Sequence, residues 1–274
     1  MTWTILVLVL GIALYMFGGM MLKHDAKKPT QGAILAKKAI ALVAILLVSG
    51  SVSRLVMPVY LVSANPFIIQ DMVESMQEQE NAEKNKEIRK FVRSNADVMV
   101  ADAPVMGAQD AKKTIFVWTD FSCPYCRRVH GEIDRVLAER DDVRVVIKNF
   151  SIHGALSDFP AKATIAANLQ DPAKAAALVD MLMTREYYSR DDMKDQDKLA
   201  EKVQKNVLKF AKEAGLDTAQ IEKDVKGEVV AREMANVRDL AQRFEITGTP
   251  FLIIGEEAFP GAIPAAKINE ALDK

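Results

Sequence analysis

Two cysteines separated by two residues are the part of this chain best suited to chemistry. An apolar run, Phe116–Trp118, leads into Thr119-Asp-Phe-Ser-Cys-Pro-Tyr-Cys126, and Cys123 and Cys126 are the only cysteines of the chain. Pro124 suits the first position of a helix, where a missing N–H costs no hydrogen bond. Cys123 would then lie where free backbone N–H groups and the helix dipole favour a thiolate. The pattern predicts a redox pair in which Cys123 reacts first and Cys126 closes the disulfide.

The composition limits what else the chain can be. It has 274 residues, of which 50% are hydrophobic, and a formal net charge of −1. This length holds one good-sized domain plus further segments. The near-zero charge gives no long-range attraction to nucleic acid, so no nucleic-acid partner is expected. A chain with only 2 cysteines is not a disulfide-rich scaffold.

The N-terminal region, residues 1–65, is strongly apolar and predicts a membrane anchor in contact with lipid. Residues 5–22 are nearly free of charge and just long enough to span a bilayer, and a second apolar run covers residues 39–64. Lysines in the short connection between the runs mark the cytoplasmic side. We expect two transmembrane helices, at about 4–22 and 39–63, with both chain ends outside the cytoplasm.

Other interpretations of this region remain open. The first run is either a span or a cleaved signal peptide, although no basic segment precedes it. In a third interpretation only the second run spans the membrane. Arg54, inside the second run, is either a functional charge or, as we favour, a side chain that reaches the outer interface. All three topologies place the chain after residue 65 on the extracytoplasmic side.

Residues 66–97 are rich in charge and predict a helical linker between the anchor and the rest of the chain. Apolar residues recur at helical spacing near both ends of this stretch. An oligomerising stalk, through residues 66–93, is the alternative, but few apolar heptads are sustained.

Residues 98–274 have the pattern of an α/β domain. A short buried strand over 114–118, a helix to about Arg140 and a strand over 143–150 predict a right-handed parallel βαβ unit. Residues from 157 to about 244 are helical in pattern. A strand beginning at Pro250, a hairpin turn and a last helix from Pro264 follow. The expected order is βαβ, a helical insert, then ββα.

The segment Thr119-Asp-Phe-Ser-Cys-Pro-Tyr-Cys126 resembles the active-site motif of the DsbA-like thiol–disulfide oxidoreductases, which have the thioredoxin fold. Further segments resemble that family in the same order. They are Pro104-Val-Met-Gly107, Ser157-Asp-Phe-Pro-Ala-Lys-Ala-Thr-Ile-Ala-Ala167, Ala214-Gly-Leu-Asp217, Gly248-Thr-Pro-Phe251 and Pro260-Gly261. The resemblance covers about residues 98–274. His153 departs from it, since an aliphatic residue is expected there, and a membrane hairpin is not typical of the soluble members.

The resemblance implies roles for residues around the cysteines. Pro124 and Tyr125, between the sulfurs, modulate the stability of the thiolate. The bond between Thr249 and Pro250 is expected to be cis and to lie against the cysteine pair, leaving the Thr249 backbone free to pair with a substrate peptide. A trans bond is the alternative that base rates favour.

Asp120 is either a proton acceptor for Cys126 or, as we favour, a turn or N-cap carboxylate. No cofactor and no metal are expected. A zinc site would need ligands beyond the cysteines, and His130, the nearest histidine, is expected on the helix surface.

Three functions remain open. We favour a membrane-tethered oxidase that passes a Cys123–Cys126 disulfide to cysteine-containing exported proteins and is reoxidised by a DsbB-like membrane partner. The second is an isomerase or reductase of the same fold, kept reduced by a membrane donor. The third is a non-enzymatic thioredoxin-fold binding module. The expected location is a bacterial inner membrane, with the catalytic domain on the periplasmic side.

Overall fold

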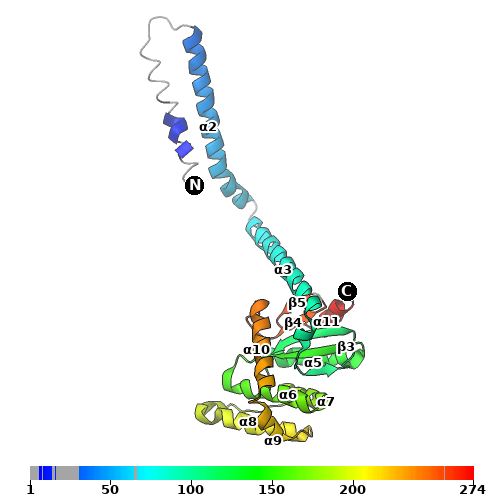
Figure 1. Ribbon diagram of the computed structural model, residues 1–274. Helices are drawn as coiled ribbons and strands as arrows, with labels where there is room; N and C mark the ends of the chain where they lie inside the picture. Colours follow the sequence, from blue (N-terminus) through cyan, green and yellow to red (C-terminus); the bar gives the residue numbers. More distant parts are fainter. Residues whose placement is uncertain (1–5, 8, 14–15, 17–30, 65–66, 256) are drawn as a thin grey trace. The chain divides into compact units, whose positions relative to one another are not determined.

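The computed structural model describes residues 6–7, 9–13, 16, 31–64, 67–255 and 257–274 (Figure 1). The chain divides into two compact units, Met1–Glu80 and Asn81–Lys274. Both cysteines lie in the second unit.

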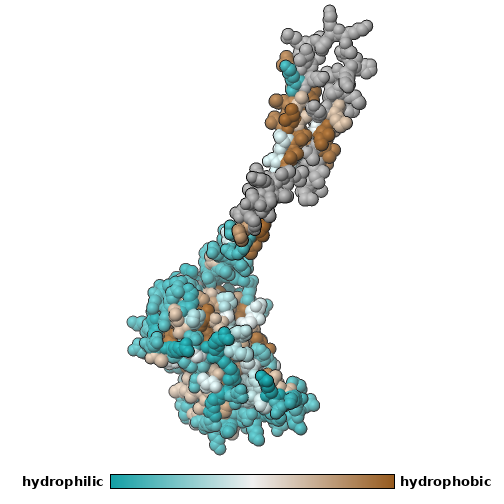
Figure 2. Space-filling model, turned by 180° about the vertical axis from the view of Figure 1, so that it is seen from behind, coloured by the Kyte–Doolittle hydropathy of each residue, from teal (hydrophilic) through white to brown (hydrophobic). Residues whose placement is uncertain are grey.

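The first unit contains the long helix α2, Gln31–Ala64, and the first part of α3, Ile68–Ser94. Helical residues 9–13 pack on α2: a Cβ added at Gly11 would lie 3.2 Å from Val48 Cγ2. Glycine allows this close approach because it has no side chain. Apolar side chains gather on the described part of this unit, while hydrophilic side chains dominate the visible surface of the second unit (Figure 2).

The sequence predicts transmembrane helices at about 4–22 and 39–63. Most of the first segment, and the side chain of Arg54, lie outside the described residues. The second segment falls within α2. Across the described ranges, no helix is both long enough and apolar enough to cross a membrane, so the two predicted spans are unsupported here.

A mixed five-stranded sheet forms the centre of the second unit, in the order β1-β3-β2-β4-β5. β2 and β3 pair in parallel, and the other neighbours are antiparallel. The strands are β1 Val105–Gly107, β2 Lys113–Thr119, β3 Val143–Asn149, β4 Phe251–Ile254 and β5 Glu257–Pro260.

Helices connect the strands in the predicted order. α5 links β2 to β3, a series of helices fills the chain between β3 and β4, and α11 follows β5. The βαβ and ββα units separated by a helical insert are therefore confirmed. The helices and short turns are α4 Ala96–Val100, α5 Pro124–Glu139, η1 Gly154–Leu156, α6 Asp158–Gln170, α7 Pro172–Thr184, η2 Asp192–Lys194, α8 Gln196–Glu213, α9 Thr218–Asp224, α10 Glu228–Arg243 and α11 Ala265–Leu272.

The sheet is buried on both faces, which explains why β2 is a continuous apolar run in the sequence. Successive side chains of a strand point to opposite faces. Ile115 and Val117 belong to the core that α5 to α9 and α11 cover, while Phe116 and Trp118 belong to a second core under α10. The two cores fix β2 from both sides, and β2 leads directly to the cysteines.

The end of α3 is part of the second core. Ile88 is 3% exposed, and the rings of Phe91 and Phe244 meet edge to face at 5.5 Å. The apolar spacing at the end of the charged stretch is therefore used in packing.

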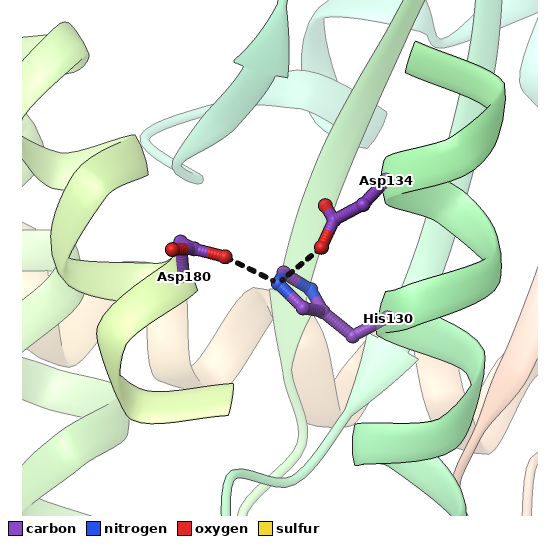
Figure 3. Close-up of side chains that lie close together, drawn as sticks. All are labelled: His130, Asp134 and Asp180. Carbon is purple, nitrogen blue, oxygen red and sulfur yellow. Dashed lines mark hydrogen bonds and ion pairs between the residues drawn. The ribbon is translucent and has the colours of Figure 1, made fainter. Parts of the chain in front are cut away.

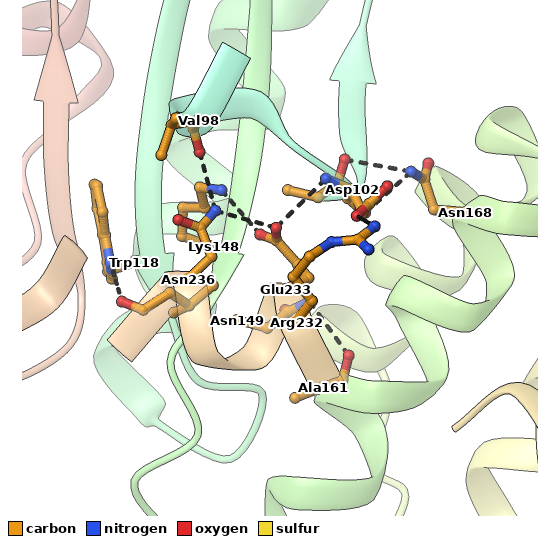
Figure 4. A network of polar contacts seen from close by, with 12 residues as sticks. Val98, Asp102, Trp118, Lys148, Asn149, Ala161, Asn168, Arg232, Glu233 and Asn236 are labelled. Carbon is orange, nitrogen blue, oxygen red and sulfur yellow. Dashed lines mark hydrogen bonds and ion pairs between the residues drawn. The ribbon is translucent and has the colours of Figure 1, made fainter. Parts of the chain in front are cut away.

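A buried ion pair links the sheet to α10 (Figure 4). Lys148 Nζ on β3 donates to Glu233 Oε1 at 2.8 Å, and the side chains are 0% and 1% exposed. Glu233 Oε2 also accepts from the Asp102 backbone N–H and from Asn236. Burial lowers the pKa of Lys148, against the attraction of Glu233. A charged side chain this deeply buried is stable only when an opposite charge and hydrogen bonds replace the water it has lost. Lys148 and Glu233 each supply that counter-charge to the other.

We expect Lys148→Met to lower the free energy of unfolding by about 3–5 kcal/mol, because Glu233 is then buried without a counter-charge. The double variant Lys148→Met/Glu233→Gln should recover most of this loss, since the amide keeps an acceptor and carries no charge. Denaturant unfolding of the three proteins measures both effects. Equal losses in the single and double variants would contradict this account of the pair.

Candidate active site

Cys123 is the N-cap residue of α5, the helix between the parallel strands. Its backbone is extended, with φ −77° and ψ 121°, and Pro124 is the first residue of the helix, as predicted. The Cys123 carbonyl accepts the first helical hydrogen bond, from the Arg127 N–H at 3.2 Å. The sulfur therefore lies at the positive end of the helix dipole, where an anion is stabilised.

The Thr249–Pro250 peptide bond is cis, as the resemblance implies. The Cys123 thiol donates to the carbonyl oxygen of Thr249, with Sγ 3.6 Å from O. Cys123 is 5% exposed, and both cysteines are free thiols in this structure. Two segments that lie 126 residues apart in the chain thus meet at one sulfur.

Cys126 lies one turn further along α5 and is fully buried. Burial raises the pKa of this thiol to about 11, although hydrogen bonds from Thr119, Thr249 and the Asp120 backbone act in the opposite direction. The Asp120 N–H lies 3.5 Å from Cys126 Sγ. The buried Thr249 hydroxyl has no other hydrogen-bond partner in the described chain, so it is free to turn toward the sulfur. At neutral pH Cys126 is a protonated thiol with donors ready to stabilise its thiolate.

The carboxylate of Asp120 organises the loops around the cysteines. It is 1% exposed. Oδ1 accepts from the Ser122 N–H at 2.8 Å and the Ser157 hydroxyl at 2.7 Å, and Oδ2 accepts from the Ile152 N–H at 2.8 Å. His153 Nδ1 lies 2.9 Å from Oδ2. The carboxylate therefore joins the loop before α5 to the loop after β3 and to the start of α6.

Burial alone would raise the pKa of Asp120, but hydrogen bonds from Ser157, His153, Ile152 and Ser122 together bring it below its ordinary value. The contact between Asp120 and Cys126 uses the backbone N–H of Asp120, while the carboxylate is occupied by the loop donors. This geometry fits the turn carboxylate better than the proton acceptor.

Two arginines follow Cys126. Arg127 donates to the carbonyls of Met183 and Arg185, both at 3.1 Å, where α7 ends. Arg128 lies over the ring of Tyr125 at 5.4 Å, and Tyr125 is 58% exposed. Arg127 thus ties the active-site helix to the insert, whereas Tyr125 and Arg128 face solvent beside the cysteines.

Two clefts are lined by residues that adjoin Cys123. One, of about 620 Å³, is lined by Ser122, Pro124 and Arg127 together with residues of the 186–193 segment. The other, of about 260 Å³, is lined by residues 245–251 and by Pro260 and Gly261. The first cleft thus touches both chain neighbours of Cys123, and the second touches Thr249, whose carbonyl accepts from Cys123.

His130 does not lie on the helix surface, so that prediction is wrong: the side chain is 4% exposed. α7 covers this face of α5, and His130 Nε2 meets Asp180 Oδ1 at 3.2 Å and Asp134 Oδ2 at 3.4 Å (Figure 3). The polar partners of its Nε2 are therefore carboxylates.

Sequence reasoning missed three residues that support the cysteines. Thr119 hydrogen-bonds to Cys126, and Ser157 and His153 bind the Asp120 carboxylate. The departure of His153 from the family pattern was the available signal, because a polar residue replaced an aliphatic one next to a buried acid.

A mixed sheet, a Cys-X-X-Cys pair at a helix N-terminus and a cis-proline against it define a dithiol protein of the thioredoxin fold. The chain belongs to the thioredoxin family: the family model described as Thioredoxin matches residues 99–274. The resemblance to DsbA-like thiol–disulfide oxidoreductases is thereby confirmed as the class of protein.

Individual proteins agree with this assignment. The chain is 30% identical to a thioredoxin-like oxidoreductase from Silicibacter pomeroyi of known structure, over 65% of this chain and 96% of that one, with a TM-score of 0.56. It is 23% identical to disulfide bond formation protein D of Bacillus subtilis, over 62% of this chain and 76% of that protein.

A longer protein also matches. The chain is 31% identical over 176 residues to Na(+)/H(+) antiporter NhaA 1 of Mycolicibacterium gilvum, which is 62% of this chain but 26% of the antiporter. The chain thus spans about a quarter of the length of the antiporters that it matches.

We expect Asp120→Asn to lower the free energy of unfolding at pH 7 by about 1–3 kcal/mol, because the amide cannot accept from all of the loop donors. The folded pKa of Asp120 lies below its ordinary value of 3.8, so the folded protein binds fewer protons than the unfolded chain. The carboxylate therefore stabilises above that value, and its contribution is lost as pH falls through the folded pKa.

Urea unfolding at several pH values tests this. The difference between wild type and Asp120→Asn should shrink as the solution becomes more acidic than the ordinary aspartate value. Asp158→Asn is the matched control, since Asp158 is 52% exposed and pairs with Lys162 at the surface; it should change stability by about 0.5 kcal/mol or less. If the difference in unfolding free energy between wild type and Asp120→Asn stays constant into acid, the charge of Asp120 does not have the proposed role.

Cys123→Ala leaves Cys126 as the single thiol. We expect its reaction with a maleimide to be slow at neutral pH and to keep accelerating until about pH 11, because burial raises its pKa to about 11. The same variant in denaturant, where the thiol is exposed, is the control and should level off earlier. Native labelling that levels off near pH 9, the ordinary value of 9.0, would refute the burial effect.

Proposed function

We propose that the chain is a thiol–disulfide oxidoreductase that introduces disulfides into exported proteins through a Cys123–Cys126 couple. The observation that carries the proposal is the position of Cys123 Sγ. It lies at the N-terminus of α5 and 3.6 Å from the Thr249 carbonyl, with Cys126 one turn behind it. Pro124 and Tyr125 between the sulfurs, and Pro250 beside them, complete the site.

In the first step a substrate thiolate attacks Cys123 Sγ of the oxidised pair. The Cys123–Cys126 bond breaks, a mixed disulfide forms, and Cys126 leaves as a thiolate that takes up a proton. The Asp120 N–H, at 3.5 Å, and the hydroxyls of Thr119 and Thr249 stabilise this thiolate as it forms.

In the second step another substrate thiolate attacks the substrate sulfur of the mixed disulfide, and Cys123 leaves as a thiolate. The N-terminus of α5 stabilises this leaving group. Two electrons have then passed from the substrate dithiol to the enzyme. A DsbB-like membrane oxidase is the proposed acceptor that restores the disulfide.

The substrate peptide is proposed to use the two clefts that residues adjoining Cys123 line. The Thr249 backbone, at the edge of one cleft, offers hydrogen bonds to an extended chain. Tyr125, whose side chain is exposed, offers an aromatic surface to the substrate.

We place residues 98–274 as the catalytic domain, residues 66–97 as the linker and residues 1–65 as the anchor, with the domain on the extracytoplasmic side of the membrane. The two apolar runs and the lysines between them support this placement. Oxidising compartments also suit a disulfide donor. Carbonate extraction of membranes tests the anchor, and release of the chain into the soluble fraction would refute it. Protease added to intact spheroplasts tests the side of the membrane, and protection of residues 98–274 would refute the extracytoplasmic placement.

The reverse direction, as an isomerase or reductase, is the second candidate. It is favoured by apolar side chains that are exposed just before and at the start of α3. They offer a surface for a homo-oligomer, and an oligomer would shield the active sites from an oxidising partner. These side chains are Phe67, Ile69, Met72, Val73 and Met76. The reduction potential separates the candidates: about −120 mV suits an oxidase and about −270 mV a reductase.

We expect wild type to oxidise a reduced model protein in a glutathione buffer and Cys123→Ala to lose this activity completely. Cys126→Ala should accumulate mixed disulfides with the client, because the resolving thiol is missing. Equal activity of wild type and Cys123→Ala would refute both directions of the enzyme and leave a binding module. Failure of Cys126→Ala to trap any of several clients would refute the role of Cys126.

A further inference from the structure

Three side chains converge between α5 and α7 (Figure 3). His130 Nε2 lies 3.2 Å from Asp180 Oδ1 and 3.4 Å from Asp134 Oδ2. All three ligand atoms lie within 4.8 Å of one another. The redox chemistry of the cysteines uses none of them.

Hydrogen bonding accounts poorly for this arrangement. Both carboxylates approach the same ring nitrogen, and that nitrogen carries one proton at most. Moreover, within the described chain neither carboxylate has an ion pair with lysine or arginine. The buried Lys148–Glu233 pair is different, because a cation is already present there.

A single cation bound to all three atoms explains both facts. Ligands about 2.0–2.1 Å from a tetrahedral ion lie about 3.3 Å from one another. Nε2 lies 3.2 Å and 3.4 Å from the two oxygens, and the oxygens lie within 4.8 Å of each other. A divalent ion would also balance the two carboxylate charges. The imidazole would then be neutral, with Nε2 as its ligand atom.

The ligand types select the ion. Carboxylates alone suit Mg²⁺ and Ca²⁺, whereas an imidazole nitrogen favours first-row transition ions such as Zn²⁺. Three protein ligands leave one position for water. The ion can also reach the site, since the Asp134 and Asp180 side chains are 39% and 50% exposed while His130 closes the inner side at 4%.

We propose that His130, Asp134 and Asp180 form a site for a divalent transition ion of the Zn²⁺ type, which cross-links α5 to α7. The cross-link joins the helix that begins at Cys123 to the helical insert. Neither sulfur belongs to the ligand set, so the site does not depend on the proposed enzyme activity.

The test uses the full chain with Cys123→Ser and Cys126→Ser, so that thiolates cannot bind metal. Titration with cobalt chloride should show one equivalent bound, with visible bands of nitrogen and oxygen ligation and no sulfur-to-cobalt charge transfer. Zinc chloride should displace the cobalt. Zinc should also raise the melting temperature of this protein.

Asp134→Asn and Asp180→Asn should each weaken cobalt binding by at least about tenfold and abolish the zinc-dependent rise in melting temperature. Glu139→Gln, at an exposed acidic residue of the same helix, is the matched control and should bind as the parent does. Circular dichroism confirms that each variant is folded. The proposal is overturned by no uptake at millimolar cobalt, by uptake that both asparagine variants retain, or by a preference for Ca²⁺ over Zn²⁺.

Discussion

One buried carboxylate holds the reactive region together. Asp120 is 1% exposed, and a charge at that depth is tolerated only where hydrogen bonds replace water. Its donors come from the loop before α5, the loop after β3 and the start of α6. Each of these hydrogen bonds replaces water at the carboxylate and also fixes a segment that borders the cysteines. The position of Cys123 at the end of its helix depends on this fixed loop, and so does the depth of Cys126.

The environments of the two sulfurs differ because α5 begins between them. Cys123 is the cap of the helix, next to free backbone N–H groups and the Thr249 carbonyl. Cys126 is inside the first turn, fully buried under the sheet. In such a dithiol, one cysteine is suited to form the mixed disulfide with a substrate, and the other is suited to resolve it. Disulfide exchange requires this asymmetry.

Much of this was predictable from local patterns. Continuous apolar runs identified the central strands because both faces of the sheet are covered, and the spacing of the cysteines with Pro124 located the start of α5. The sequence could not show which side chains from distant segments would meet. His130 was expected at the surface, since a helical pattern does not reveal that α7 covers that face. Ser157 and His153 contact Asp120 from loop segments, and hydrophobic periodicity predicts helices and strands but not the course of a loop. The two apolar runs near the N-terminus met the length criterion for spans, but the described helices do not support them.

The Lys148–Glu233 pair has a consequence for how such domains diversify. Lys148 belongs to the sheet and Glu233 to the last helix of the insert, so the pair spans the junction between the common scaffold and its added module. Recombination that exchanged the module alone would deliver one charge to a site lacking its complement. In physical terms, the scaffold and the insert of this chain are matched to each other, and either one combined with an uncharged partner would bury a lone charge.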